Sequence, residues 1–160
     1  KSQAALEFLT TYGWAFLVIL IMISTLAYFG VLSPSKLLPE RCNFGSELGC
    51  RDYKLDKSNG QVLLKLTNNV GETITVTSIL TSNEAATPLI CSFTGSQSIS
   101  QGVSQDFTLG AGTCPVAEWT TAGLNANQKG KVQVTVTYNT AQGGALYPHI
   151  VQGEIFATVQ

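Results

Sequence analysis

The amino-acid sequence predicts an α+β protein in which a long N-terminal hydrophobic α-helix precedes an antiparallel β-sandwich. The 28 residues from Phe8 to Ser35 include no charged side chain, whereas apolar and polar residues alternate with a period of two from residue 61 onward. A long uncharged apolar run is typical of a membrane-spanning helix, and alternation is typical of half-buried strands. We therefore expect a helix at 1–32, a connector at 33–60 and an outer β-domain at 61–160.

The apolar segment is long enough to cross a membrane. At ~1.5 Å per residue its uncharged part would form a helix of roughly 42 Å, and a bilayer core needs only about 20 apolar residues. A secretory signal peptide has an apolar core of about 7–15 residues, so the segment does not fit that class. Pro34 marks the expected end of the helix. Because the segment is apolar on every side, it must be surrounded by lipid or by other helices.

Glu7 is the only charged residue between Lys1 and Lys36. A carboxylate at the centre of a bilayer costs ~2.5 kcal/mol or more and usually marks a function. One interpretation is an acid near the lipid interface, stabilised by ~0.3–1 kcal/mol through the helix dipole. The other is an acid that pairs with a cation when helices pack together away from lipid. The candidate cations are Lys1 and the α-amino group of a neighbouring chain.

The start of the chain also carries a resemblance. The run QAALEF at positions 3–8, followed by LTTYGWA and an unbroken aliphatic stretch, resembles the class III signal peptide region of archaeal type IV pilins. In that family a short basic leader precedes a Gln, a Glu follows four residues later, and an aromatic residue often comes next. Gln3, Glu7 and Phe8 match this pattern, and the resemblance covers about residues 1–30. It implies that a prepilin peptidase cuts on the cytoplasmic side, often directly before the Gln, and that the helix is kept. A chain without an initiator Met agrees with such processing.

The resemblance implies a structural subunit, the major pilin of an archaeal type IV adhesion pilus. The precursor would wait in the cytoplasmic membrane, and a pilus assembly ATPase with platform proteins would build it into an extracellular homopolymer. Gln3, Glu7 and Phe8 would form the N-terminal assembly motif. The residues expected to pack in the helix bundle are Leu9, Tyr12, Trp14, Phe16, Leu17, Leu20, Ile23, Tyr28 and Phe29. The alternatives are an archaellin, which is the subunit of a motility filament, and a membrane-anchored extracellular binding domain.

The second half of the chain reads as short strands separated by turns. Turn signals at Asn68–Gly71 and Ala141–Gly144 divide the strands, which predicts an immunoglobulin-like β-sandwich. No helical pattern is visible after residue 60. The expected strands cover 61–67, 73–80, 105–109, 132–138 and 150–159.

Four cysteines predict disulfides rather than a metal site. No CxxC motif is present, and the only His, His149, is distant in sequence from all four. An even count in an exported protein favours disulfides, and three pairings are possible. We favour Cys42–Cys50, which flanks a short Gly-containing loop, together with Cys91–Cys114. Free thiols in a reducing compartment are the alternative.

Composition argues against nucleic-acid binding and catalysis. Nine basic and ten acidic residues give a net charge of −1, so there is no basic surface for phosphates. No nucleophile-elbow, dinucleotide, phosphate-loop or zinc-protease motif is present. We expect no enzyme activity, no cofactor and no metal. His149 is expected to be exposed and Trp119 to be a core or interface aromatic. Asp52 and Asp56 alternate with basic residues, which predicts a solvated mixed-charge surface rather than a cation site.

Overall fold

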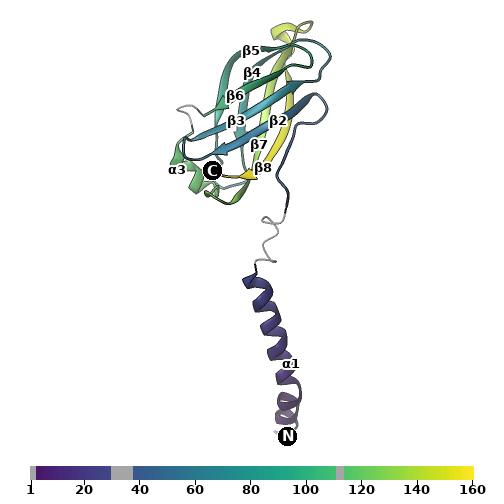
Figure 1. The fold of residues 1–160 in the computed structure, drawn as a ribbon, viewed down its shortest axis with the longest axis vertical. Coiled ribbons are helices and arrows are strands. Elements are labelled where there is room, and N and C mark those ends of the chain that lie inside the picture. The colour runs from purple at the N-terminus through teal and green to yellow at the C-terminus, as the bar shows by residue number, and fades with distance from the viewer. Residues whose placement is uncertain (1–2, 30–37, 111–113) are drawn as a thin grey trace. The chain divides into compact units, whose positions relative to one another are not determined.

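The computed structural model describes residues 3–29, 38–110 and 114–160 (Figure 1). The chain divides into two compact units, Lys1–Leu38 and Pro39–Gln160. In the first unit, helix α1 covers Gln3–Tyr28, which is 26 residues. No proline interrupts this range, and leucine and alanine favour a helix, so its length follows directly from composition. Residues 30–32 of the expected helix lie outside the described residues, as does 33–37 of the expected connector.

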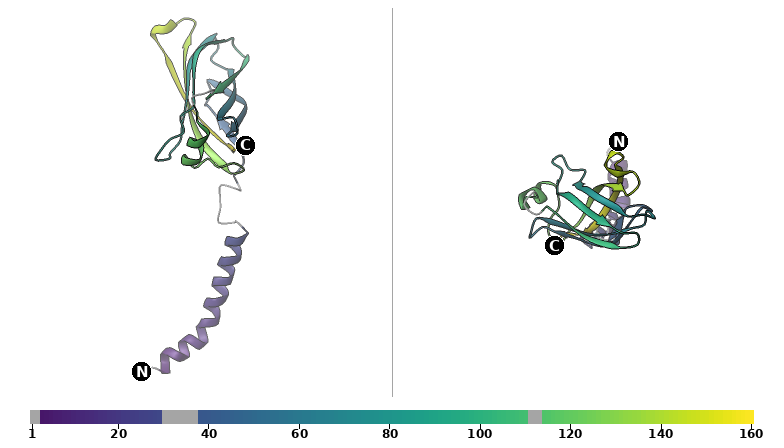
Figure 2. Two further views of the ribbon diagram at one scale, coloured as in Figure 1. Left: turned by 90° about the vertical axis from the view of Figure 1, so that its left-hand side faces the viewer. Right: turned by 90° about the horizontal axis from the view of Figure 1, so that it is seen from above.

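The second unit consists of eight strands in two antiparallel sheets, which confirms the predicted α+β fold (Figures 1 and 2). A five-stranded sheet has the order β1-β8-β7-β4-β5, and a three-stranded sheet has the order β2-β3-β6. The strands are β1 (Arg41–Asn43), β2 (Leu48–Asp56), β3 (Gln61–Asn68), β4 (Ile74–Ser82), β5 (Ser92–Ile99), β6 (Ser104–Leu109), β7 (Lys129–Thr140) and β8 (His149–Thr158).

One hydrophobic core lies between the two sheets. Alternate residues of β7 point inward, so Val132, Val134 and Val136 are fully buried while the residues between them are partly or fully exposed. Leu64 and Leu66 on β3 contribute to the same core from the other sheet. Since successive side chains of a strand point to opposite faces, the period-two pattern in the sequence corresponds to the inner faces of both sheets.

The expected connector at 33–60 is corrected by the structure. It contains β1 and β2, so the β-domain begins at β1 rather than at residue 61. Leu48 and Leu55 of β2 are fully buried, whereas Arg51 and Asp52 between them are exposed. Charged residues on the exposed face of this edge strand make its sequence look like a polar connector. A shift of register between Cys50 and Asp52 also interrupts the period of two, so buried and exposed positions do not alternate regularly along β2.

Two short helical segments follow residue 60, where none was expected. Helix α3 covers Val116–Thr121, and a 3-10 turn, η1, covers Gly144–Leu146. Neither is long enough to show a helical period in the sequence. Trp119 of α3 is fully buried in the core, and His149 is exposed, as predicted for both.

Asp56 also differs from the prediction of a solvated surface charge. It is only 5% exposed at the end of β2. Its Oδ2 accepts hydrogen bonds from Lys54 Nζ at 2.9 Å and Asn59 Nδ2 at 3.0 Å, and its Oδ1 accepts one from the Asn59 backbone N–H at 3.1 Å. The hydrogen bonds from Lys54 and Asn59 lower the pKa of Asp56 to about 2. The carboxylate therefore fixes the β2–β3 turn instead of facing solvent.

Candidate functional site

The surface of helix α1 is unusual because it is almost entirely apolar and exposed. Every large apolar side chain from Leu6 to Phe29 is exposed, with Trp14 at 68% and the least exposed, Val18, at 37%. Monomeric soluble proteins rarely expose contiguous apolar surface beyond a few hundred Å². The range Ala5–Tyr28 is long and apolar enough to cross a membrane. The helix therefore requires an apolar environment around its exposed side chains.

The threonine hydroxyl groups of α1 are compatible with such an environment. Thr11 Oγ1 donates to the Glu7 carbonyl at 2.7 Å, and Thr25 Oγ1 donates to the Met22 carbonyl at 2.8 Å. Thr10 Oγ1 lies 3.0 Å from the carbonyl oxygens of Leu6 and Glu7. Because these donors are satisfied inside the helix, lipid or a neighbouring helix does not have to supply a partner.

Glu7 is the only charged residue of α1. Its side chain is exposed, and within the described residues no hydrogen bond or ion pair reaches its carboxylate. Gln3 begins the helix one turn earlier and lies on the same face, since residues four apart are neighbours on a helix. The side chain of Gln3 and the whole of Lys1 lie outside the described residues, so the expected pairing of Lys1 with Glu7 does too.

The residues predicted to pack in a helix bundle fall on more than one face. At 3.6 residues per turn, one stripe contains Leu9, Tyr12, Phe16, Leu20 and Ile23. The other predicted residues project from the rest of the helix, where Glu7 also lies: Trp14, Leu17, Tyr28 and Phe29. All nine are exposed. Contact with one partner could cover the stripe, but at least two partners are needed to cover both sides.

A shallow apolar groove runs along this stripe. Phe8 and Tyr12 form one wall, with ring centroids 4.7 Å apart. At Gly13 the groove is open, because a Cβ atom there would meet nothing within 4 Å. Sequence reasoning missed three of the lining residues, two of which are small and therefore left no hydrophobic signal. The groove is lined by Phe8, Leu9, Tyr12, Gly13, Ala15, Phe16 and Ile19.

Both disulfides of the β-domain join the favoured pairs. Cys42 is bonded to Cys50 and Cys91 to Cys114, with Cα atoms 5.9 and 4.8 Å apart. The first bond ties β1 to β2 and hence one sheet to the other. The second ties the segment before β5 to the segment before α3, across 23 residues. Both bonds therefore hold together elements that no sheet ladder connects.

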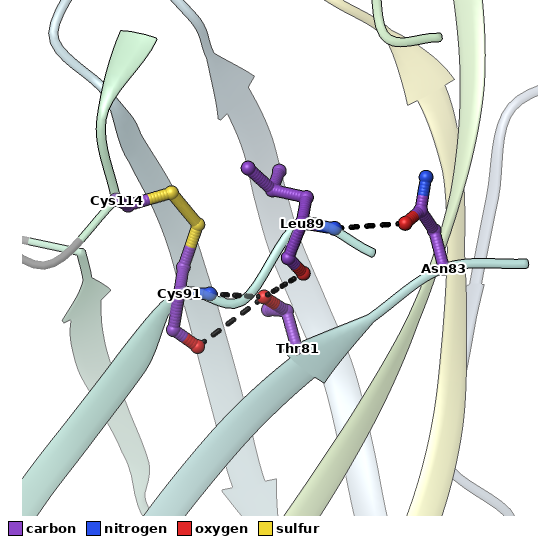
Figure 3. Close-up of a disulfide and its surroundings, with 5 residues drawn as sticks. All are labelled: Thr81, Asn83, Leu89, Cys91 and Cys114. Carbon is purple, nitrogen blue, oxygen red and sulfur yellow. Dashed lines mark hydrogen bonds between the residues drawn. A yellow bond between two sulfur atoms is a disulfide. The ribbon is translucent and has the colours of Figure 1, made fainter. Parts of the chain in front are cut away.

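Hydrogen bonds hold the chain in place before β5 (Figure 3). Thr81 Oγ1 accepts a hydrogen bond from the Cys91 backbone N–H at 2.7 Å and lies 3.2 Å from the Leu89 carbonyl oxygen. Asn83 Oδ1 accepts one from the Leu89 backbone N–H at 2.8 Å. This buried network positions Cys91 for its bond to Cys114. Among the described residues there is no group of three or more His, Cys, Asp or Glu side chains that could hold a metal ion.

Comparisons with known proteins give only distant similarity. No family model and no curated protein matches this sequence. One similar solved structure is the archaeal flagellum of Methanospirillum hungatei strain JF1, at 14% identity over 96% of this chain and 93% of that chain, with a TM-score of 0.30. Another is a putative late embryogenesis abundant protein, at 13% identity over 94% of this chain and 89% of that chain, with a TM-score of 0.27. At these TM-scores neither similarity carries an argument about fold or function.

Proposed function

We propose that this chain is the structural subunit, the major pilin, of an archaeal type IV adhesion pilus that polymerises through α1 into an extracellular filament. The observation that carries the proposal is a 26-residue helix that exposes apolar side chains on all sides and holds a single carboxylate near its start. A helix with this surface is stable only in lipid or among other helices, and a pilin uses both environments in turn.

Before assembly, α1 would span the cytoplasmic membrane with the β-domain outside. Its 24-residue apolar range satisfies the length requirement of a bilayer core. The internally bonded Thr10, Thr11 and Thr25 add no unsatisfied donors. Glu7 lies only one turn after Gln3, so its carboxylate can reach the interface, where its cost is lower than at the bilayer centre. A prepilin peptidase would process the chain near Gln3.

During assembly, the helices would leave the lipid and bundle. The groove beside Gly13 would receive apolar side chains of one neighbour, and the face with Trp14 and Glu7 would contact another. Contacts between two different surfaces of identical subunits are heterologous, and they generate open helical polymers. Transfer of the Glu7 carboxylate from the lipid–water interface into the helix bundle requires a pairing cation. The N-terminal amine of a neighbouring copy would supply it, or Lys1 where processing keeps residue 1. An assembly ATPase and membrane platform proteins would drive this step.

The β-domain would form the outer layer of the filament. Its two disulfides suit an oxidising extracellular location, and in the chain-entropy model each contributes about 2–4 kcal/mol. We assign it a structural and adhesive role that requires neither a cofactor nor catalysis. An archaellin would use the same helix chemistry, and the two filament types are distinguished by whether loss of the chain abolishes attachment or swimming.

The test compares Glu7→Gln with Asp106→Asn, which removes an exposed carboxylate from the β-domain. Cells are sheared, and the released material is pelleted and viewed by electron microscopy. We expect filaments of this chain from the native protein and from Asp106→Asn, but accumulation of Glu7→Gln in the membrane. A native chain that is found only in detergent extracts would refute the proposal. A chain that reaches the surface equally well with Gln at position 7, without filaments, would indicate an anchored binding domain.

A further inference from the structure

Strand β8 has an uncovered edge. It runs over His149–Thr158, but β1 pairs only with its residues 154–156. In the described part of the chain, residues 149–152 are bonded to β7 alone. The ladder ends because Phe44 leaves β1 and is buried against Gly153, where a Cβ atom would lie 2.4 Å from the Phe44 ring. Beyond this point, no strand in the described ranges lies beside the outer backbone N–H and C=O groups of β8.

Strand β5 is the other edge of the same sheet. Its residues 92–99 pair with β4 on one side. On the other side, among the described residues, one backbone bond is formed, from Gly110 N–H to the Ser92 carbonyl at 3.1 Å. Thr94, Gly95, Ser96 and Ser98 are exposed. Within residues 38–110 and 114–160, no further backbone hydrogen bond covers this edge from residue 93 to residue 98.

The two open edges lie at the same level of the sheet. Following the register across the strands, Ile150 is opposite Thr137, Thr137 is opposite Ser78, and Ser78 is opposite Thr94. Each step is antiparallel, so three steps leave β8 antiparallel to β5. A second copy displaced sideways would thus present its β5 to the open part of β8 in a direction that suits an antiparallel ladder.

Neither open edge carries a charged side chain or a proline, although the edge of β5 is irregular. Exposed edges are usually protected by charged side chains, prolines or bulges. Residues 149–152 and 93–98 include no Lys, Arg, Asp, Glu or Pro. The register of β5 against β4 shifts between Gln97 and Thr94, so the regular part of the open edge that the contact would use is centred on Thr94. The edges of the three-stranded sheet differ, because β2 exposes Arg51 and Asp52 and β6 exposes Asp106 at 75%.

From these observations we propose that the open edge of β8 in one copy of this chain pairs with β5 of the next copy, so that the five-stranded sheet continues between subunits. The occupant is a second copy because one chain offers both halves of the contact at one level and in antiparallel direction. The charged edges of the three-stranded sheet would disfavour strand pairing there, so the contact would form on the five-stranded sheet. The inference rests on the proposed filament, which brings identical copies side by side.

The test is a cysteine crosslink in sheared filaments. Residues directly opposite in an antiparallel pair have Cβ atoms about 4.5–5.5 Å apart, which a disulfide can bridge. The four native cysteines are already paired, so new thiols react separately. We expect the double variant Ile150→Cys with Thr94→Cys to give a ladder of covalent oligomers on non-reducing gels. The matched pair, Ile150→Cys with Asp106→Cys on the edge of β6, should give none.

A second variant keeps the inference testable if the double variant does not fold. Thr94→Lys places a charge on the open edge of β5, and Gln101→Lys places the same charge on the exposed β5–β6 turn. We expect Thr94→Lys to lower the yield of filaments at least several-fold, with Gln101→Lys close to the native protein. Filaments that form normally with Thr94→Lys, or that give no 150–94 ladder, would overturn this contact. Absence of filaments from the native chain would instead overturn the proposed function.

Discussion

Replacement of Asp56 by Asn tests whether a single buried carboxylate fixes the β2–β3 turn. Oδ2 of Asp56 accepts from two donors, Lys54 Nζ and Asn59 Nδ2, while Oδ1 accepts from the Asn59 backbone N–H. An Asn side chain has only one acceptor oxygen. In either orientation of its amide, at least one of these donors faces an NH₂ group instead of an oxygen.

The expected loss of stability follows from the pKa of Asp56, which falls from 3.8 to about 2 on folding. A lowering of this size corresponds to about 2–3 kcal/mol, and screening of the half-exposed Lys54 ammonium reduces the expected loss to about 1–2 kcal/mol. Because folding lowers this pKa, the contribution is complete above pH 4. It is lost progressively as the pH falls through about 2, because the carboxylate is protonated in both states only below both pKa values.

The assay is guanidinium unfolding of the full chain in mild detergent, followed by the circular dichroism of the β-domain at several pH values. We expect Asp56→Asn to be less stable than the native chain at pH 7, and the difference to narrow steadily as the pH falls from about 4 through about 2. Asp106→Asn is the matched control, because Asp106 also faces a lysine, at 3.3 Å, but is 75% exposed. Its effect should stay below about 0.5 kcal/mol. A difference between Asp56→Asn and the native chain that is constant from pH 7 to pH 2 would refute the electrostatic reasoning.

Substitutions at three further positions address the packing of the β-domain. Tyr138 is buried and donates a hydrogen bond to Glu47 Oε2 at 2.9 Å, so Tyr138→Phe should cost about 1–2 kcal/mol in denaturant unfolding. Burial, and then the hydrogen bond to Glu47, raise the pKa of Tyr138 to about 12. The contribution of the Tyr138 hydroxyl to stability should therefore be complete below about pH 10 and lost as the pH rises toward about 12. A loss of stability in Tyr138→Phe that is the same at pH 12 as at pH 7 would contradict this reasoning. Trp119 Nε1 is buried without a hydrogen-bond partner among the described residues. Trp119→Phe should therefore lower the free energy of unfolding by about 1–2 kcal/mol, against about 3–5 kcal/mol for Trp119→Ala. Equal losses for the two variants in thermal or denaturant unfolding would argue that the indole N–H is hydrogen-bonded. In Gly153→Ala the new methyl group would collide with the Phe44 ring and with the Asn43 backbone carbonyl, so we expect a loss of about 1–3 kcal/mol. A neutral result in the same assay would mean that the backbone at Asn43 and the Phe44 ring both move freely.

The sequence predicted those parts of the fold whose signal is local. Helix α1 follows from an uncharged apolar run, because the free energy of burying a segment depends on its composition. The strands β3, β4, β7 and β8 follow from alternation, because each has one face in the core. The cysteine pairs follow partly from the short loop between Cys42 and Cys50. None of these predictions required knowledge of which strands are neighbours.

Other features were misread because their pattern depends on distant residues. The charged stretch that contains β2 resembles a connector in sequence. Leu48 and Leu55 are buried only because the other sheet lies against them, and the sequence of β2 alone does not show this. Asp56 was assigned to a solvated surface, although it lies in a turn that Asn59 closes over it. Helix α3 is too short for a period, and only the burial of Trp119 reveals why it forms.

The sequence by itself determined that this chain needs an apolar environment for its N-terminal helix, because the side chains of α1 alone carry that requirement. The tertiary structure decided which strands lie at the edges of the sheets and where β1 stops covering β8. Backbone N–H and C=O groups are the same in nearly every residue, so an unpaired edge leaves no trace in composition or periodicity. Only the arrangement of strands shows which of these groups have a neighbour.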